Sequence, residues 1–533
     1  MYGVAFYKSN IQLIFKRLVS KMTKNEILML TAFILYFVAV LAIGIWFFVR
    51  SKSAGEKDYF LGGRSMGPFV TAMSAQASDM SGWLLMGFPG SILAFGMGQA
   101  WIGIGLALGT AANWILVSTR LRRFSKAAND SITLPQYLSN RFCTKNPVLQ
   151  IICAVVFLVF FTVYVASSFV AGGTVFQEVI PFFADKGELA ILIFAIILIA
   201  YTFLGGFKAV CWTDFFQAIM MLIALLAVPI MIVTLKNPDM SLLGQVLPYG
   251  TEGETVGFTS NLFSASWQDI ASGLAWGLGY FGMPHILVRF MSIKDPKKMK
   301  TSATVAIVWV VITLASAIVL AYLGRVVYGP ELLAQQAQKN IFIKAVKDLF
   351  PAFIAGILLS AIIAAAMSTA DSQLLVSSSS FTSDIYKPVI RKNASEKEVL
   401  WVCRGVVVLV AIVAYFIAAN GGKGAQAIMT MVDNAWGGFG ASFGPVIILS
   451  LFWKRLTYKG AIAGVVGGAV VDVLWLFLLT DVTGIYELLP GFIVGLVAAI
   501  VVSLIDKKPS AEVEELFDRA TSGEEDSDEL VAG

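Results

Sequence analysis

The sequence is poor in charged residues and in the residue types that build most catalytic and metal centres. Charged residues make up 14% of the 533 residues and hydrophobic residues 58%, whereas average soluble domains carry about 25% charged residues. A single histidine excludes a histidine-rich metal cluster, and four cysteines without CxxC spacing suggest neither a zinc site nor a disulfide framework. We therefore predict that the protein is not an enzyme and uses no cofactor.

The formal net charge of +5 does not indicate nucleic-acid binding. The basic residues lie in short segments between long apolar runs, where loop charge determines how a membrane protein is oriented. We expect a lipid bilayer around the chain, no nucleic acid, and no obligate protein partner.

Apolar runs of about 20 residues, the length that crosses a bilayer, recur from residue 27 to residue 505 without a hydrophilic block between them. They predict an all-α integral membrane protein with about thirteen transmembrane helices in a single domain, residues 27–506. Residues 1–26 are predicted to be an N-terminal extension without a removable signal peptide, and residues 507–533 an acidic, solvated tail with no fold of its own. The predicted spans are 27–49, 67–95, 98–118, 148–178, 189–207, 212–235, 266–290, 302–327, 346–378, 399–419, 425–452, 458–480 and 487–506.

Lysine and arginine collect in alternate loops, at residues 50–64, 120–145, 294–300 and 387–397. Because cytoplasmic loops are enriched in these residues, we predict a multi-pass protein of the cell (inner) membrane with its C-terminus in the cytoplasm and its N-terminus outside. The basic N-terminus is the one segment that disagrees with this orientation.

Glycine and proline interrupt two of the predicted spans. The second span contains SAQASDMSGWLLMGFPG at residues 74–90, and the seventh contains ASGLAWGLGYFGMPH at residues 271–285. Two interrupted spans at matching positions of two groups of five indicate a binding site in a secondary transporter with inverted repeats. The alternative is that these glycines only permit close helix packing.

Asp79 lies in the middle of the second span, where a carboxylate costs roughly 2.5 to 3.5 kcal/mol on insertion scales and so needs a partner or a purpose. A cation site is one purpose. The alternative is that Asp79 caps a half-helix that starts near Ser81.

Two adjacent hydroxyls, Ser368 and Thr369, lie in an alanine-rich span. Such hydroxyls often turn back to carbonyls three or four residues earlier, which places the Ala365 carbonyl beside both. With unwound carbonyls around Ala77 and Met80, these neutral oxygens suit a monovalent cation. The alternative is a packing seam between helices.

Aromatic residues of the seventh span suggest a site for a small organic solute. Trp276, Tyr280 and Pro284 are spaced by four and so share one helical face, and Tyr164 in the fourth span could face the same cavity. Aromatic rings around a cavity fit a partly apolar solute, and free N–H groups at a broken helix favour a carboxylate on it. Aromatics at the lipid interface are the alternative.

Five motifs make a family resemblance specific: DYFLGGRSMG at 58–67, SDMSGWLLMGFPG at 78–90, YTFLGGFKAVCWTDFFQA at 201–218, GLGYFGMPHILVRF at 277–290 and MSTADSQLLVSSS at 367–379. Together they resemble the solute:sodium symporter family, and most closely its proline-carrying members, from about residue 25 to residue 505. The resemblance implies a five-plus-five inverted-repeat core of the leucine-transporter type.

The resemblance also implies roles for individual residues. A sodium ion is expected on the Ala77, Met80 and Ala365 carbonyls and the Ser368 and Thr369 hydroxyls. The implied sodium-linked residues are Asp79 with Ser81 and Gly82 beside it, Asp214 on the sodium path, and Arg64 at the cytoplasmic mouth. The implied substrate-binding residues are Tyr164, Trp276, Tyr280 and Pro284. The family assigns no role that we can transfer to Asp371.

From the sequence we therefore predict a symporter that carries L-proline into the cell by alternating access, with sodium as the coupling ion. Another small organic solute, such as pantothenate or another carboxylate, is the alternative. A membrane sensor is disfavoured because the tail after Lys508 is too short for a signalling module.

Overall fold

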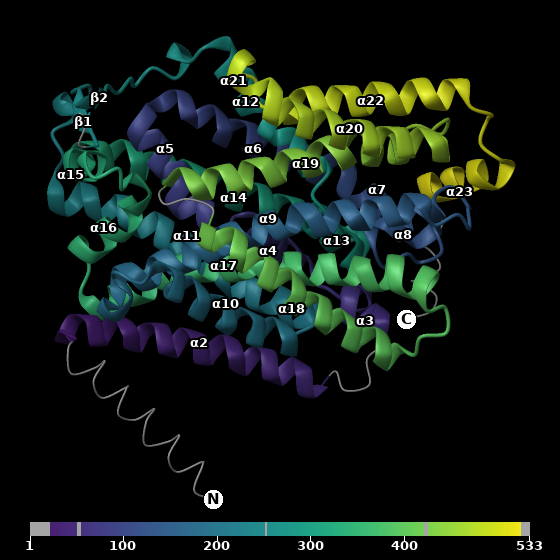
Figure 1. Ribbon diagram of the computed structural model, residues 1–533, viewed down its shortest axis with the longest axis horizontal. Coiled ribbons are helices and arrows are strands. Elements are labelled where there is room, and N and C mark those ends of the chain that lie inside the picture. The colour runs from purple at the N-terminus through teal and green to yellow at the C-terminus, as the bar shows by residue number, and fades with distance from the viewer. Residues whose placement is uncertain (1–21, 51–54, 251–252, 421–424, 524–533) are drawn as a thin grey trace, which may run out of the picture.

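The structure is a computed structural model that describes residues 22–50, 55–250, 253–420 and 425–523. Long helices run side by side along the horizontal axis of Figure 1, and the two ends of the bundle lie at its left and right. The predicted N-terminal extension lies outside the described residues up to residue 21.

Ten helices among the described residues are long and apolar enough to cross a membrane, and two further apolar helices, Trp83–Phe95 and Gly187–Phe203, are shorter. The prediction of an all-α membrane protein is thereby confirmed. The uninterrupted helices are α2 (Lys24–Arg50), α9 (Val148–Val179), α10 (Gly187–Leu204), α11 (Phe207–Lys236), α14 (Met299–Val327), α17 (Ala352–Ser380), α18 (Glu396–Asn420), α19 (Ala425–Phe452), α20 (Tyr458–Leu478) and α22 (Leu488–Ile505).

The two spans predicted to be interrupted are broken helices. The first is α4 (Pro68–Asp79), the π-helical turn η2 (Trp83–Gly87) and α5 (Phe88–Phe95). The second is α12 (Trp267–Ala275), the 3-10 helix η8 (Trp276–Phe281) and α13 (Pro284–Ser292). The spacing of Trp276, Tyr280 and Pro284 therefore does not place them on one face of a continuous α-helix, because Met283 has an extended backbone between η8 and α13.

Short elements cover the two ends of the bundle. The β-hairpin pairs β1 (Leu247–Tyr249) with β2 (Glu254–Val256) in antiparallel register at the left of Figure 1, near α15 and α16. The opposite end carries α3, α7 and α8. The bounds of the remaining main elements are α3 (Glu56–Leu61), η1 (Gly62–Arg64), α6 (Ala100–Ala112), η4 (Asn113–Val117), α7 (Ser118–Ala127), α8 (Leu134–Asn140), α15 (Gly329–Ala334), α16 (Ile341–Leu349), η11 (Phe381–Ile390) and α21 (Thr480–Thr483).

Glycines bring α6 into backbone contact with the second broken helix. A Cβ atom on Gly109 would lie 2.2 Å from the Gly277 carbonyl oxygen, and one on Gly105 would lie 2.2 Å from the Gly273 carbonyl oxygen. Real Cβ atoms essentially never come so close to another atom. The packing of α6 on α12 and η8 therefore depends on the absence of side chains at these positions.

The tail does have structure, contrary to the prediction that it has no fold of its own. Helix α23 (Ala511–Ser522) follows Ser510 and ends at Gly523, whose φ of 80° suits glycine. Its buried residues recur with helical spacing, which gives the helix one apolar face among many acidic residues. These buried residues are Val513, Leu516, Phe517 and Ala520.

Candidate functional site

The first broken helix meets α17 at a patch of neutral oxygens. The Ser368 hydroxyl lies 2.7 Å from the Ala77 carbonyl oxygen and 3.2 Å from the Ala365 carbonyl oxygen, and it can donate to either. All three residues are completely buried. The contact with Ala365 is the backward bond expected from the helical spacing, whereas the contact with Ala77 joins residues 291 positions apart.

Two more of the oxygen groups predicted to bind sodium lie at this patch or next to it in the chain. The Thr369 hydroxyl follows Ser368 on α17 and is buried without a hydrogen-bond partner among the described residues. Met80 lies in the break that follows α4, with a non-helical ψ of 83°. A buried hydroxyl without a partner carries a desolvation cost, and a bound cation would remove that cost.

Asp79, the last residue of α4, connects the two broken helices. The Tyr280 hydroxyl donates to the Asp79 carboxylate at 2.5 Å, and the Tyr164 hydroxyl lies 3.5 Å from the Asp79 backbone carbonyl. The capping role considered for Asp79 belongs to Ser81 instead, whose hydroxyl accepts from the Trp83 N–H at 3.2 Å. The Asp79 carboxylate therefore serves the contact between the broken helices.

Gly82 lies between Ser81 and η2, against α9. A Cβ atom at this position would lie 2.5 Å from the Ala171 Cβ. The break therefore packs tightly on α9, the helix that also carries Tyr164.

A stack of aromatic rings joins the two breaks. Trp276 stacks on Trp83 with ring centroids 5.7 Å apart and on Tyr486 at 5.4 Å, while Trp436 packs against Tyr280 at 5.0 Å. Trp276 is only 4% exposed. Trp83, Trp436 and Tyr486 were not selected from the sequence, because their contribution depends on contacts between distant spans.

Two other predicted aromatic-site residues are also buried. Tyr164 comes from α9, and its ring lies edge-on to His285, the residue after Pro284. Pro284 is the first residue of α13, a position where its missing N–H costs nothing. The structure thus brings Tyr164 and Tyr280 to Asp79, with Trp276 on the same 3-10 helix as Tyr280 and Pro284 at the end of the same break.

Asp214 is fully buried in a polar network that ties four helices together. Its carboxylate accepts from the Ser74 hydroxyl at 2.6 Å and from the Arg289 guanidinium at 3.0 Å. Arg289 also donates to the Ser372 hydroxyl at 2.5 Å. The network links α4, α11, α13 and α17, so Asp214 lies deep inside the bundle.

Sequence reasoning did not select Arg289, although an arginine within an apolar span could have been noticed because it demands a partner. Asp371, for which no role was predicted, is also fully buried. The Ser372 hydroxyl lies 3.3 Å from one Asp371 carboxylate oxygen, and the other oxygen has no hydrogen-bond partner among the described residues.

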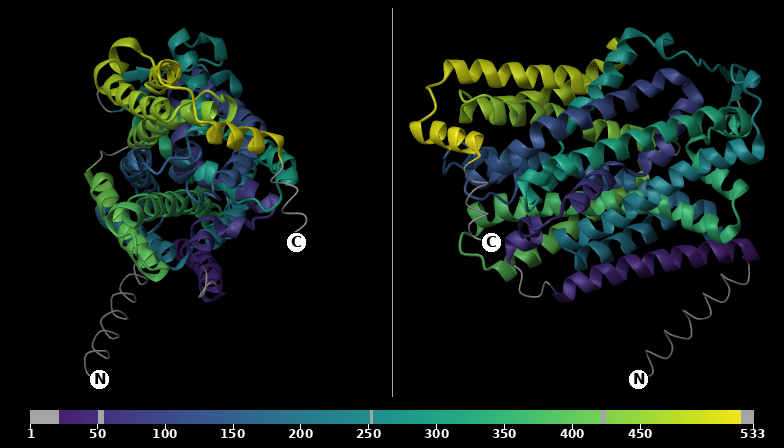
Figure 2. Two further views of the ribbon diagram at one scale, coloured as in Figure 1. Left: turned by 90° about the vertical axis from the view of Figure 1, so that its right-hand side faces the viewer. Right: turned by 180° about the vertical axis from the view of Figure 1, so that it is seen from behind.

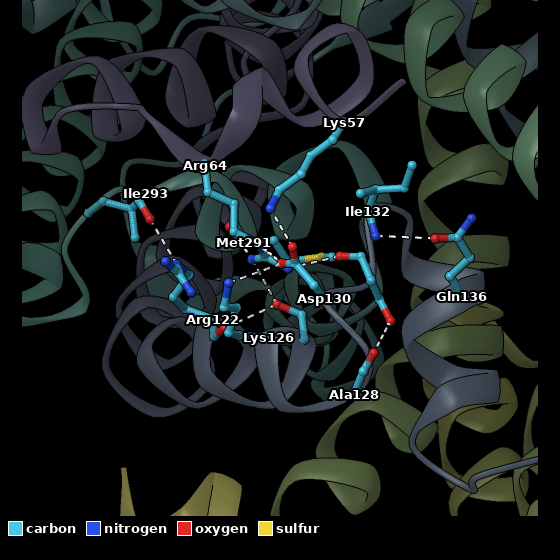
Figure 3. Close-up of polar contacts among 12 residues, drawn as sticks. Lys57, Arg64, Arg122, Lys126, Ala128, Asp130, Ile132, Gln136, Met291 and Ile293 are labelled. Carbon is cyan, nitrogen blue, oxygen red and sulfur yellow. Dashed lines mark hydrogen bonds and ion pairs between the residues drawn. The ribbon is translucent and has the colours of Figure 1, made fainter. Parts of the chain in front are cut away.

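Arg64 lies in η1, which directly follows α3, and holds together the end of the bundle that carries α3 and α7. Its guanidinium donates to the Asp130 carboxylate at 2.8 Å, the Met291 carbonyl at 2.5 Å, the Ser131 carbonyl at 2.9 Å and the Ser125 hydroxyl at 3.1 Å. Figure 3 shows Arg64 and Lys57 converging on Asp130, with Met291 close by. We refer to these groups as the Arg64 network, which joins the ends of η1, α7 and α13.

Asp130 is the anionic member of this network and lies in the turn after α7, outside the apolar spans. Although partial burial opposes ionisation, the hydrogen bond from Lys57 and the positive charges of Arg64 and Lys126 lower the pKa of the Asp130 carboxyl. Asn129, Asp130 and Arg64 all have positive φ angles, of 56°, 47° and 51°. Such backbone conformations are costly for residues other than glycine and persist where the surroundings enforce them.

Two ion pairs connect α3 at this end to the neighbouring helices. Glu56 accepts from Lys387 of η11 at 2.5 Å, and Asp58 pairs with Lys208 of α11 at 3.2 Å. These pairs lie at least partly in solvent, so each contributes little on its own.

Within the described part of the chain, no group of three or more His, Cys, Asp or Glu side chains is placed to hold a metal ion. The oxygens at Ser368 are neutral carbonyls and hydroxyls. Such a set suits a monovalent cation better than a divalent one, because it brings no negative charge into direct contact with the ion.

Known proteins resemble this chain over most of its length. The model of the sodium:solute symporter family matches residues 59–468. The sodium/proline symporter of Haemophilus influenzae is 42% identical over 498 residues, covering 92% of this chain and 97% of that protein. The high-affinity proline transporter PutP of Bacillus subtilis is 42% identical over 482 residues, covering 89% of this chain and 98% of that protein.

Solved structures show the same fold at lower sequence identity. A sodium-coupled sialic acid symporter in a substrate-bound, outward-open state has a TM-score of 0.72 at 19% identity and covers 91% of this chain and 98% of its own. The nucleobase-cation symporter Mhp1 in a closed conformation has a TM-score of 0.55 at 14% identity and covers 86% of this chain and 98% of its own.

Proposed function

Because this chain belongs to the sodium:solute symporter family, we propose that it carries L-proline into the cell together with sodium by alternating access. Similarity over nearly the full length to proteins named as sodium/proline symporters supports this choice of solute. The single structural observation that carries the proposal is the contact of the Ser368 hydroxyl with the Ala77 and Ala365 carbonyls, beside the break in the second span.

In this proposal the sodium ion binds between the first broken helix and α17. Its ligands are the carbonyls of Ala77, Met80 and Ala365 and the hydroxyls of Ser368 and Thr369. The close approach of three of these groups and the unpartnered Thr369 hydroxyl support the assignment. When the ion binds, the Ser368 proton turns away and its lone pairs face the ion.

The solute binds beside Asp79, among Tyr164, Trp276, Tyr280 and Pro284. The stacked rings offer an apolar surface for a pyrrolidine ring, and backbone N–H groups at the breaks can donate hydrogen bonds to a carboxylate. The burial of the aromatic stack supports a state of the protein in which the proposed solute site is closed off from solvent. A different small carboxylate is the alternative solute.

The finer architecture that we propose has about thirteen spans with a five-plus-five inverted-repeat core, the N-terminus outside and the C-terminus in the cytoplasm. The Arg64 network then closes the cytoplasmic mouth. Asp214 lies on the sodium path towards the cytoplasm, and its partner Arg289 must release it for sodium to use that path.

Coupling between sodium and solute follows from the contact between Asp79 and Tyr280. Sodium fixes the end of α4, which positions the Asp79 carboxylate, with Ser81 and Gly82 holding the turn that follows. Asp79 in turn positions Tyr280 beside the solute. Because binding free energies are reciprocal, the solute must raise the sodium affinity by the same factor.

Uptake into proteoliposomes tests the proposed function. We expect an inward sodium gradient to drive accumulation of labelled L-proline, and we expect uptake to fall to background when choline replaces sodium at constant pH. Equally fast uptake in choline would contradict sodium coupling. Competition by unlabelled pantothenate and other carboxylates, with proline as reference, tests the solute. Stronger competition by one of them would overturn the choice of proline.

Replacing Asp79 by asparagine should weaken the apparent sodium affinity. The amide keeps the size of the side chain and can still accept from Tyr280, but it removes the negative charge next to the site. We expect the sodium concentration for half-maximal uptake to rise by about tenfold, the equivalent of about 1.4 kcal/mol. The measurement is initial uptake against sodium concentration at saturating proline, and an unchanged sodium dependence would remove Asp79 from the mechanism.

A further inference from the structure

We propose that helix α23 is a brace that holds the Arg64 end of the protein closed. This inference rests on the proposed function, because only a carrier with alternating access has to open that end. In the left view of Figure 2 the last helix, at the yellow end of the colour scale, runs across the end of the bundle. Its contacts reach both α7, which carries part of the Arg64 network, and the connection between α19 and α20.

The apolar face of α23 is anchored by Phe517. The Phe517 ring packs edge-on against Phe124 of α7 with centroids 5.3 Å apart, and the Arg141 guanidinium lies 4.9 Å from its centre. Arg141 is completely buried and donates to the Ser450 carbonyl at 3.1 Å and to the Val513 carbonyl at 3.4 Å. The attraction between a cation and an aromatic ring is strongest where water is excluded, so Phe517 anchors α23 to the buried Arg141 and to α7.

A second contact reaches the turn that carries Asp130. Arg519 donates to the carbonyl of Ala127, the last residue of α7, at 3.1 Å. Asn129 and Asp130, which both have positive φ angles, follow after Ala128, and the Asp130 carboxylate accepts from Arg64. Arg519 thus fixes the start of the turn on which the Arg64 network depends.

The opposite edge of α23 is tied to the connection between α19 and α20. Lys454 pairs with Asp518 at 2.6 Å and approaches Glu514 at 3.8 Å. A movement of α7 away from α19 would have to break these pairs, the Arg519 contact or the packing of Phe517. The brace therefore opposes the relative movement that opens this end, and its ion pairs make it weaker at high ionic strength.

Hydrogen exchange of the full-length protein in lipid nanodiscs tests the brace. The variants are Phe517→Ala, which removes the anchor, and Arg519→Ala, which removes only the contact with Ala127. Thr521→Ala is the matched control, because Thr521 is exposed on the same helix and takes no part in the contacts described above. The readout is amide exchange in residues 125–131 and 289–293, compared with exchange in α23 itself.

We expect Phe517→Ala to speed exchange in residues 125–131 by about tenfold and Arg519→Ala by about threefold, because local opening becomes easier. Thr521→Ala should leave these rates unchanged. Faster exchange confined to α23, with residues 125–131 unchanged in both variants, would overturn the brace and leave α23 as a passive attachment. If Phe517→Ala does not fold, Arg519→Ala decides by itself.

The exchange experiment is independent of transport, so the two proposals can fail separately. A wild-type protein without sodium-dependent proline uptake contradicts the proposed function, whatever the exchange rates are. Normal uptake by the wild type, with unchanged exchange in residues 125–131 of both variants, contradicts only the brace.

Discussion

Replacing Ser368 by alanine is expected to abolish sodium-stimulated proline uptake. The Ser368 hydroxyl is the group that approaches both the Ala77 and the Ala365 carbonyls. Without it, a sodium ion loses a ligand in a fully buried place where water cannot easily substitute. Removing one partner from a buried polar site costs about 1 to 3 kcal/mol, and more when the other partner is charged, so we expect at least a hundredfold loss of apparent sodium affinity.

The measurement is initial proline uptake over a wide range of sodium concentrations, corrected for the amount of protein in the membrane. Ser377→Ala is the matched control, since Ser377 is a fully buried serine on the same helix whose hydroxyl donates to the Leu374 carbonyl at 3.2 Å. If Ser368→Ala keeps the wild-type sodium dependence, or if Ser377→Ala impairs it equally, the sodium site is not at Ser368.

Replacing Arg64 by lysine should reduce the uptake rate by about a hundredfold, because a lysine cannot serve the same acceptors. The Arg64 guanidinium reaches Asp130, Met291, Ser131 and Ser125 from one planar group. Lysine keeps the charge but offers a compact ammonium without the fork geometry. Buried carbonyls would lose their donors at about 1 to 3 kcal/mol each, and the Arg64 end would no longer close properly.

Lys57→Gln is the control for this experiment, because Lys57 contacts the same carboxylate from a side chain that is 43% exposed. Exposed ion pairs contribute about 0 to 1 kcal/mol, so we expect less than a fivefold change in uptake. Similar losses in both variants would show that charge near Asp130, rather than the geometry of Arg64, is what matters. Thermal unfolding of the purified variants separates a defect in gating from a general loss of stability.

The sequence was sufficient for features that depend on local pattern. Glycine and proline marked both broken helices, and helical spacing placed the Ser368 hydroxyl at the Ala365 carbonyl. The same reasoning failed where the helix changes its period, since Trp276 and Tyr280 lie on a 3-10 helix. The prediction for the tail was also wrong, because its acidic composition outweighed the apolar face of α23, which only four residues form.

Contacts between distant spans could not be predicted, because no local pattern encodes them. The bond from Tyr280 to Asp79 joins residues 201 positions apart, and the bond from Arg64 to Met291 joins residues 227 positions apart. The sequence identified Asp79 as a residue that needs a partner and the family resemblance selected Arg64, but only the fold supplies the partners of both. The sodium-site residues themselves stay a prediction until the ion dependence of the variants is measured.

The glycine contact between α6 and the second broken helix has a mechanical consequence. At the contacts of Gly109 with Gly277 and of Gly105 with Gly273, backbone lies directly against backbone, so no flexible side chain separates the helices at these two points. We therefore expect α6 and the second broken helix to move together as one rigid unit during the transport cycle. A bulky residue at Gly109 would force α6 away from η8. We expect such a residue to block the transport cycle without contacting sodium or the solute.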